Sequence, residues 1–272
     1  MKKISGINYL LVILTSMLNL NIRPLYSSST ILNCTGQIPN KTACLIEANS
    51  FKVKVRRIDI CQKNPFPSYR STADYSGSKC INLFNEKIAG QGYLEKSKKF
   101  NIPKNLFIEK GEYKYISIIL ENKFIVSGKY NAGNYFWATS KEGPKTIIQS
   151  NKDISNPDEF TSKLNNWRGE KNLDNKYCEN NGGTSSRCDV QYNGFRMTGI
   201  GLDPDFVETS GKKTKYMFFI TELSPTIKLN IDTKGYFNID FKKNLEVFGN
   251  KLAVKSISIA PFKFRARFVS EN

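Results

Sequence analysis

Six cysteines and the complete lack of histidine constrain this 272-residue chain more than any other feature. Cysteines stay reduced in the cytosol and pair in oxidising compartments, so an even number of them in an exported chain predicts a cross-linked fold. A chain without histidine lacks the commonest general base and the commonest metal ligand. Ser-His-Asp and Cys-His catalysis and histidine metal sites are therefore excluded. We predict no catalytic residue, no cofactor and no metal site.

Residues 1–29 are typical of a secretory signal. Lys2 and Lys3 precede an apolar run at 4–20, and serines at 27–29 provide the small residues of a cleavage site. The run is short and contains two asparagines, whereas a membrane-spanning helix needs about 20 apolar residues. A cleaved signal is thus favoured over a retained anchor. We expect a secreted, periplasmic or cell-surface protein with no transmembrane span in the mature chain.

The chain is strongly basic. It has 32 lysines, nine arginines and a formal charge of +17, of which the signal contributes three, which leaves +14 (17 minus 3). Such a charge favours anionic partners, for instance an acidic glycan, lipopolysaccharide or an envelope surface. Sites that read nucleic acid prefer arginine to lysine, so there is no specific nucleic-acid signal. A solubilising lysine-rich surface is the alternative explanation.

The spacing of the cysteines favours local disulfides. Six cysteines allow 15 pairings. Short separations favour Cys34–Cys44, Cys61–Cys80 and Cys178–Cys188. Loops of about 10 to 20 residues each contribute roughly 2–4 kcal/mol in the chain-entropy picture. A zinc site would need cysteines about two to four positions apart, and no two cysteines here are closer than ten.

Alternating apolar and polar residues predict a mainly β fold, one or more antiparallel β-sandwiches. The alternation from Phe51 slips at Arg56 and Arg57, which predicts a β-bulge or a strand end there. Segments 113–120 and 124–127, joined by Glu-Asn-Lys, predict a β-hairpin. Further strands are expected at 80–84, 216–221, 226–231, 235–241, 252–260 and 262–268.

A polar insert at 139–190 is predicted to carry one short amphipathic helix. Asn156 suits the N-cap and Pro157 the first helical position. Phe160, Leu164 and Trp167 then form one apolar stripe, and a glycine at 169 ends the helix. The expected organisation is a signal at 1–29, an N-terminal sandwich domain at 30–138, this insert, and C-terminal strands at 191–272.

Three segments within 51–130 carry a resemblance: Arg-Ile-Asp-Ile-Cys at 57–61, Cys-Ile-Asn-Leu-Phe at 80–84, and Ile-Glu-Lys-Gly-Glu-Tyr-Lys-Tyr at 108–115. Together they resemble uncharacterised secreted proteins of marine bacteria. The last segment is similar to the glycine-tyrosine turn of prealbumin-like β-sandwich domains. The resemblance implies a sandwich fold and a Cys61–Cys80 bridge, and it implies no activity.

Two basic rows are the candidate binding residues. Alternate residues of a strand share one face, so two strands each present three bases about 6.6 Å apart. The rows are Lys52, Lys54 and Arg56 on the first strand, and Lys263, Arg265 and Arg267 on the last. Such rows suit phosphate or sulfate groups, and a solvated or charge-protected edge is the alternative. The odds of a shared site rise if the two strands are neighbours.

The leading expectation is an exported, non-enzymatic envelope or surface protein with a structural or adhesive role. A polyanion-binding module that uses the basic rows is the first alternative. A carboxylate-based hydrolase is the second, because glycoside hydrolysis needs two carboxyl groups and no histidine. Asp203 and Asp205 are the nearest such pair, but they flank a proline, which is typical of a turn. Calcium binding by the oxygen-rich stretch 151–159 matches no EF-hand spacing.

Overall fold

The structure is a computed structural model that describes residues 33–66, 72–86, 92–95, 99–101, 109–164, 187–192, 195–209, 211–229, 235–242, 245–259 and 263–270. The predicted signal at 1–29 lies outside these residues. Throughout the described ranges the chain is mainly β, as predicted, and all pairs between named strands are antiparallel. No helix in these ranges has the length and apolar character required to cross a bilayer.

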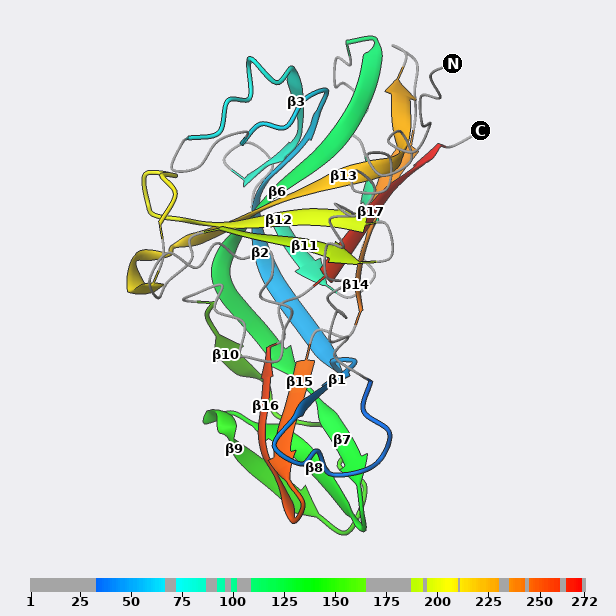
Figure 1. Cartoon of the computed structure of the whole chain (residues 1–272), viewed down its shortest axis with the longest axis vertical. Helices are drawn as coiled ribbons and strands as arrows, with labels where there is room; N and C mark the ends of the chain where they lie inside the picture. Colours follow the sequence, from blue (N-terminus) through cyan, green and yellow to red (C-terminus); the bar gives the residue numbers. More distant parts are fainter. Residues whose placement is uncertain are drawn as a thin grey trace, which may run out of the picture.

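A sheet of eight strands forms the centre of the molecule (Figure 1). Its main path runs β11 (Arg187–Tyr192), β12 (Phe195–Leu202), β13 (Tyr216–Leu229), β6 (Gly111–Ser127), β2 (Ser50–Cys61) and β3 (Cys80–Asn85). β4 (Gly92–Glu95) pairs with β2, and β10 (Phe160–Ser162) pairs with β6. Strands from both expected halves of the chain thus share one sheet.

Three smaller sheets complete the fold. They comprise β1 (Ala43–Ile46) with β15 (Leu245–Asn250) and β16 (Ala253–Ile259); β17 (Lys263–Ser270) with β14 (Gly235–Lys242) and β5 (Lys99–Asn101); and β7 (Lys129–Ala132) with β8 (Tyr135–Ser140) and β9 (Gly143–Ser150). In Figure 1 the long strands β2 and β6 run down from the central sheet to the sheets that contain β7–β9 and β15–β16.

The central sheet buries apolar side chains on both faces. Successive residues of a strand point to opposite faces, so Ile118 and Leu120 of β6 enter the main core, while Ile119 between them enters a second, smaller core. Phe219 and Phe218 of β13 divide in the same way. Two buried faces explain why these strands read as nearly continuous apolar runs.

Two predicted disulfides are present. Cys34 bonds Cys44, and Cys61 bonds Cys80, which joins the end of β2 to the start of β3. Cys178 lies outside the described residues, and so does the predicted pair of Cys178 with Cys188.

The hairpin predicted around 121–123 is wrong, because β6 continues without a turn. Phe124 faces Val53 and Leu120 faces Val55, so Glu-Asn-Lys lies opposite a single residue of β2 as a bulge. Asn122 stabilises this path: its side-chain nitrogen donates to the carbonyls of Leu164 and Thr214, at 2.8 and 3.0 Å. The polar side chain of Asn122, which predicts a turn in the sequence, thus binds distant backbone groups inside a continuous strand.

The amphipathic helix predicted from residue 156 is also wrong where the structure describes the segment. Residues 156–159 have no regular structure, and Phe160 begins β10, where it faces Val126 of β6 and is buried. Strand pairing with β6 buries Phe160 and outweighs the local capping pattern, which is a weak preference. Trp167 and the glycine at 169 lie outside the described residues.

Candidate functional site

A pocket of about 560 Å³ opens on the face of the central sheet that carries the second core. Ile119, Leu202 and Ala73 form apolar parts of its wall. Arg56 and Arg57 line it from β2, and we call it the arginine pocket. Its volume lies in the range of about 300–1,000 Å³ that is usual for small-molecule sites.

A β-bulge brings both arginines to this face. The pairing of β2 with β6 shifts between Val55 and Arg57, which confirms the bulge predicted from the slip in alternation. Val55 and Ile58 flank the bulge and both enter the main core. The two consecutive arginines between them therefore share the opposite face, which a regular strand would not allow.

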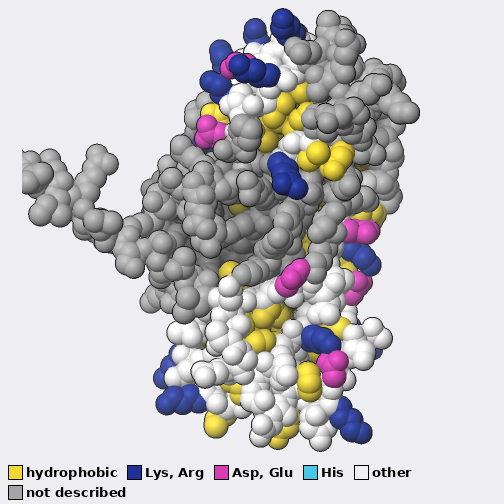
Figure 2. All heavy atoms as spheres, turned by 90° about the vertical axis from the view of Figure 1, so that its right-hand side faces the viewer, with side chains coloured by type: hydrophobic (Ala, Val, Ile, Leu, Met, Phe, Trp, Pro, Cys, Tyr) yellow, Lys and Arg dark blue, Asp and Glu magenta, His cyan; other side chains and the backbone are white. Residues whose placement is uncertain are grey.

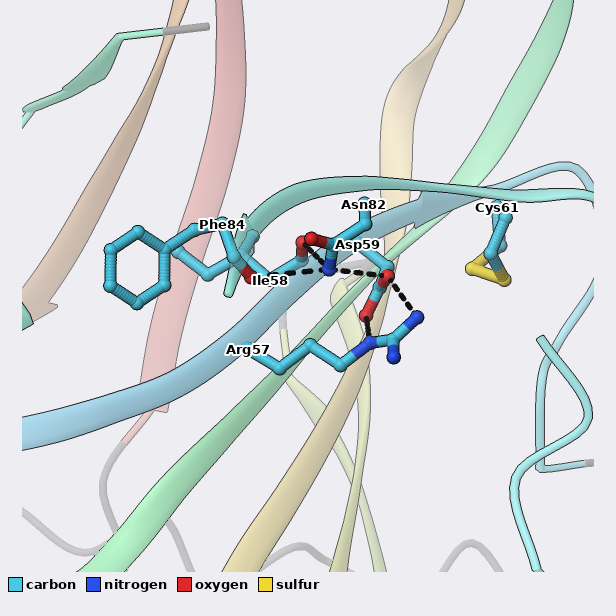
Figure 3. Close-up of polar contacts among 7 residues, drawn as sticks. Arg57, Ile58, Asp59, Cys61, Asn82 and Phe84 are labelled. Atoms are coloured by element: carbon cyan, nitrogen blue, oxygen red, sulfur yellow. Dashed lines mark hydrogen bonds and ion pairs between the residues drawn. A yellow bond between two sulfur atoms is a disulfide. The ribbon is translucent and has the colours of Figure 1, made fainter. Parts of the chain in front are cut away.

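Arg57 is held by a buried carboxylate. Its Nε and Nη2 donate to the two oxygens of Asp59, at 2.7 and 2.8 Å, and Asp59 is 1% exposed. The guanidinium also lies over the ring of Tyr75, 3.8 Å from its centre. In Figure 3 the remaining terminal nitrogen of Arg57 points away from Asp59. The arginine is thus fixed on one edge and one face, a preorganised donor.

Asn82 supports this pair from β3 (Figure 3). The pairing of β2 with β3 has its own bulge between Ile58 and Asp59. The Asn82 amide donates to Asp59 Oδ1 at 3.0 Å and to the carbonyls of Ile58 and Phe84 at 3.3 and 3.1 Å. The two N–H groups of the Asn82 amide are therefore shared among two carbonyls and the carboxylate at an irregular point of the sheet.

Burial shifts the ionisation of this cluster. Loss of solvent raises the pKa of Asp59, and the hydrogen bonds and charge of Arg57 and the bond from Asn82 only partly oppose it. Burial lowers the pKa of Arg57, but Asp59 outweighs burial and the net pKa is raised. Burial, together with the Asp59 charge, raises the pKa of Tyr75 far above its ordinary value. Tyr75 is a neutral hydroxyl at any physiological pH.

Arg56 is neutralised by carboxylates at the edge of the pocket. Its Nη1 pairs with Glu86, which also pairs with Lys54, and its Nη2 donates to Glu121 at 3.1 Å. The guanidinium lies 5.5 Å from the ring centre of Tyr216. Burial acts to raise the pKa of Glu86, but the hydrogen bonds and charges of Lys54 and Arg56 hold it below its ordinary value.

The loop that carries Tyr75 is tightly folded. Asp74 donates its backbone N–H to the carbonyl of Pro65 at 2.8 Å, and Cys80 donates to the carbonyl of Tyr75 at 2.9 Å. The Asp74 carboxylate accepts from the backbone of Gly77 at 2.8 Å. With the Cys61–Cys80 disulfide, these bonds place the Tyr75 ring as a fixed wall of the pocket.

A second loop presents Phe206 at the rim. Asp203 Oδ1 accepts from the backbone N–H groups of Asp205 and Val207, at 2.9 and 3.0 Å, which confirms a turn at Asp203. Phe206 has a φ of +62°, a conformation that L-residues other than Asn and Asp rarely adopt, and it is 42% exposed. Its ring stacks on Tyr216 with centres 4.8 Å apart and planes 4° apart.

The three bases of the row on β2 all form ion pairs with carboxylates of the protein. Lys52 pairs with Glu159 at 3.2 Å, Lys54 with Glu86, and Arg56 with Glu86 and Glu121. The hydrogen bond from Ser50 lowers the pKa of Glu159, and the hydrogen bond and charge of Lys52 lower it further, while burial opposes them. These bases are therefore partners of the protein's own acids.

The second basic row lies on β17, which pairs with β14 in another sheet and not with β2. Lys263, Arg265 and Arg267 therefore do not extend the row of Lys52, Lys54 and Arg56. Arg267 is exposed, and the side chains of Lys263 and Arg265 lie outside the described ones. On the face in Figure 2, several of the described Lys and Arg side chains gather at the upper end with an acidic side chain among them, and the others are scattered.

The other oxygen-rich candidates are dispersed as well. Asp153 pairs with Lys129 at 2.7 Å, and Asp158 accepts from the backbone of Lys141 at 3.4 Å. Three or more Cys, Asp or Glu side chains in a metal-binding arrangement do not occur within the described ranges. Glu86 and Asp205 both line the arginine pocket, and Glu86 is held ionised by its two cations.

Sequence reasoning missed the aromatic residues of the site: Tyr75, Phe206 and Tyr216. The slip at Arg56 and Arg57 was a usable signal for one wall of the pocket. No local pattern marked the aromatic residues, because the first two lie on loops that the fold brings together. Comparison with protein-family models, with curated protein sequences and with solved structures found no match to this chain.

Proposed function

We propose that the protein is an exported, non-enzymatic binding protein of the cell envelope or surface, and that it binds a small ligand or the end of a larger one in the arginine pocket. The observation that carries this proposal is the rigid construction of the pocket. Arg57 is fixed by Asp59 and Tyr75, Asp59 by Asn82, and Tyr75 by a stapled loop. Side chains held in this way lose little conformational entropy on binding, which favours affinity.

Disulfides support the export part of the proposal. Cys34–Cys44 and Cys61–Cys80 persist only where thiols are oxidised, outside the reducing cytosol of most organisms. The ionisation of Glu86 supports the non-enzymatic part. A glycosidase-type general acid requires a carboxyl group with a raised pKa, whereas ion pairing lowers that of Glu86.

Titration of the ¹⁵N-labelled mature chain with a mixture of neutral, anionic and cationic ring compounds tests the binding proposal. We expect chemical shifts to change at Arg57, Tyr75 and Phe206 and to stay constant at Tyr135, an exposed aromatic residue of β8 that does not line the pocket. Shifts that are absent with all three classes of compound contradict the proposal. Chemical conversion of a bound compound contradicts its non-enzymatic part.

A further inference from the structure

We propose that the arginine pocket binds a neutral sugar ring, such as a terminal or internal residue of an uncharged glycan. This inference rests on the proposed binding function and names the class of ligand. Three properties of the pocket carry it: the balance of charge, the mixture of free hydrogen-bonding groups, and a flat aromatic surface at the rim.

The charged side chains that line the pocket cancel. They are two cations and two carboxylates: Arg56, Arg57, Glu86 and Asp205. Two acids that do not line the pocket also pair with these cations, Asp59 with Arg57 and Glu121 with Arg56. An anionic ligand would therefore meet no excess positive charge, although the whole chain is strongly basic. A neutral ligand does not need an excess of positive charge to bind.

The free polar groups of the pocket include both donors and acceptors. Within the described part of the chain, Arg57 Nη1, the Tyr75 hydroxyl and the Asp205 carboxylate make no hydrogen bond or ion pair to the protein. Arginine only donates, an ionised carboxylate only accepts, and a phenol does both. Sugar hydroxyls act as donor and acceptor at once, so they can use this whole set.

The rim offers a face for the apolar side of the ring. One side of a pyranose carries mainly C–H groups, and aromatic surfaces bury such groups well. Phe206 and Tyr216 form a stacked pair there, and the Phe206 backbone holds an unfavourable conformation to present its ring. Strain of this kind persists where the surrounding structure imposes it, often at ligand sites.

A glycan microarray that displays neutral and acidic oligosaccharides, probed with the mature protein, tests the inference. We expect binding to one or more neutral glycans, with an affinity that changes less than twofold between about 0.05 and 0.5 M salt, since no counterions are released. Phe206→Asn keeps a residue that tolerates a positive φ and removes the ring, and we expect at least a tenfold loss. Tyr75→Phe keeps the ring and removes the hydroxyl, and we expect a smaller loss.

Tyr135→Asn is the matched control, because Tyr135 is as exposed as Phe206 but lies on β8 outside the pocket. Its binding should equal that of the wild type. Binding confined to acidic glycans, with steep salt dependence, overturns the neutral-sugar inference. An array without any bound glycan also overturns it, and if the ring compounds still shift the pocket residues, the binding function itself survives. Neutral-glycan binding that withstands Phe206→Asn and Tyr75→Phe shows that the sugar binds elsewhere and overturns the assignment to this pocket.

Discussion

Removal of the Cys61–Cys80 disulfide should lower stability and loosen the arginine pocket at the same time. The bond closes a separation of 19 residues and joins β2 to β3. The chain-entropy relation, about 2.1 plus 1.5R ln n in cal/mol/K, gives about 11 cal/mol/K for this loop, which is about 3.2 kcal/mol at 25 °C. Cys61 is fully buried, so alanine at this position adds the loss of a packed sulfur.

The double variant Cys61→Ala/Cys80→Ala is the perturbation, and urea unfolding at neutral pH is the assay. We expect the free energy of unfolding to fall by at least about 3 kcal/mol. Amide hydrogen exchange should quicken at Asp74, at Ser78 and at the alanine that replaces Cys80, because the backbone N–H groups at these three positions hold the loop of Tyr75. Exchange reports the local opening that loosens the pocket wall.

Cys34→Ala/Cys44→Ala is the matched control. Its bond closes a separation of 10 residues, for which the same relation gives about 2.7 kcal/mol. Stability should fall by a similar amount, and exchange around Tyr75 should stay unchanged. A loss below about 1 kcal/mol in the first variant refutes the chain-entropy argument. Equal exchange around Tyr75 in both variants refutes the view that this disulfide positions the pocket wall.

Three further outcomes test the ion pairs, the strained loop and the bulge. Glu86→Gln should lower the free energy of unfolding by about 1–3 kcal/mol at pH 7. The pKa of Glu86 in the folded protein lies below the ordinary 4.5, so the stability that its charge contributes is present above 4.5 and is lost as the pH falls through the folded pKa. Urea unfolding at pH 3 should therefore show a smaller difference between the variant and the wild type. Phe206→Gly relieves the positive φ and loses the stacking, so the melting temperature should reflect a net change within about 1 kcal/mol, whereas Phe206→Val should destabilise clearly. Asn122→Ala removes three side-chain hydrogen bonds and should lower the free energy of urea unfolding by about 2–4 kcal/mol. A loss below about 0.5 kcal/mol contradicts the role of Asn122 in continuing β6.

Sequence periodicity could predict β2 and one wall of the site because both patterns depend on neighbouring residues. The alternation from Phe51 identifies the buried face of β2, and the slip at Arg56 and Arg57 identifies the bulge. Short cysteine separations gave the two local disulfides for the same reason. In each case the residues that carry the sequence signal lie within about 20 positions of one another.

The errors and omissions depend on distant partners. Asn122 reads as a turn residue until its bonds to Leu164 and Thr214, 42 and 92 residues away, are known. Phe160 reads as a helix residue until its pairing with β6 is known. The sequence analysis missed the aromatic wall of the pocket for the same reason, since Tyr75 and Phe206 come from loops 131 positions apart. Local preferences are weak and tertiary contacts override them.

The irregularities of β2 explain why the site lies where it does. A strand that alternated strictly from Phe51 would direct Arg57 and Asp59 into the main core beside Val53 and Val55. An ion pair in that core would lose its hydration, which costs several kcal/mol per ion and is regained only with excellent geometry. The bulge instead turns the pair toward a face where Asn82 satisfies Asp59 and one edge of Arg57 reaches a pocket. The departure from regular pairing therefore protects the core and creates the polar group that a ligand can use.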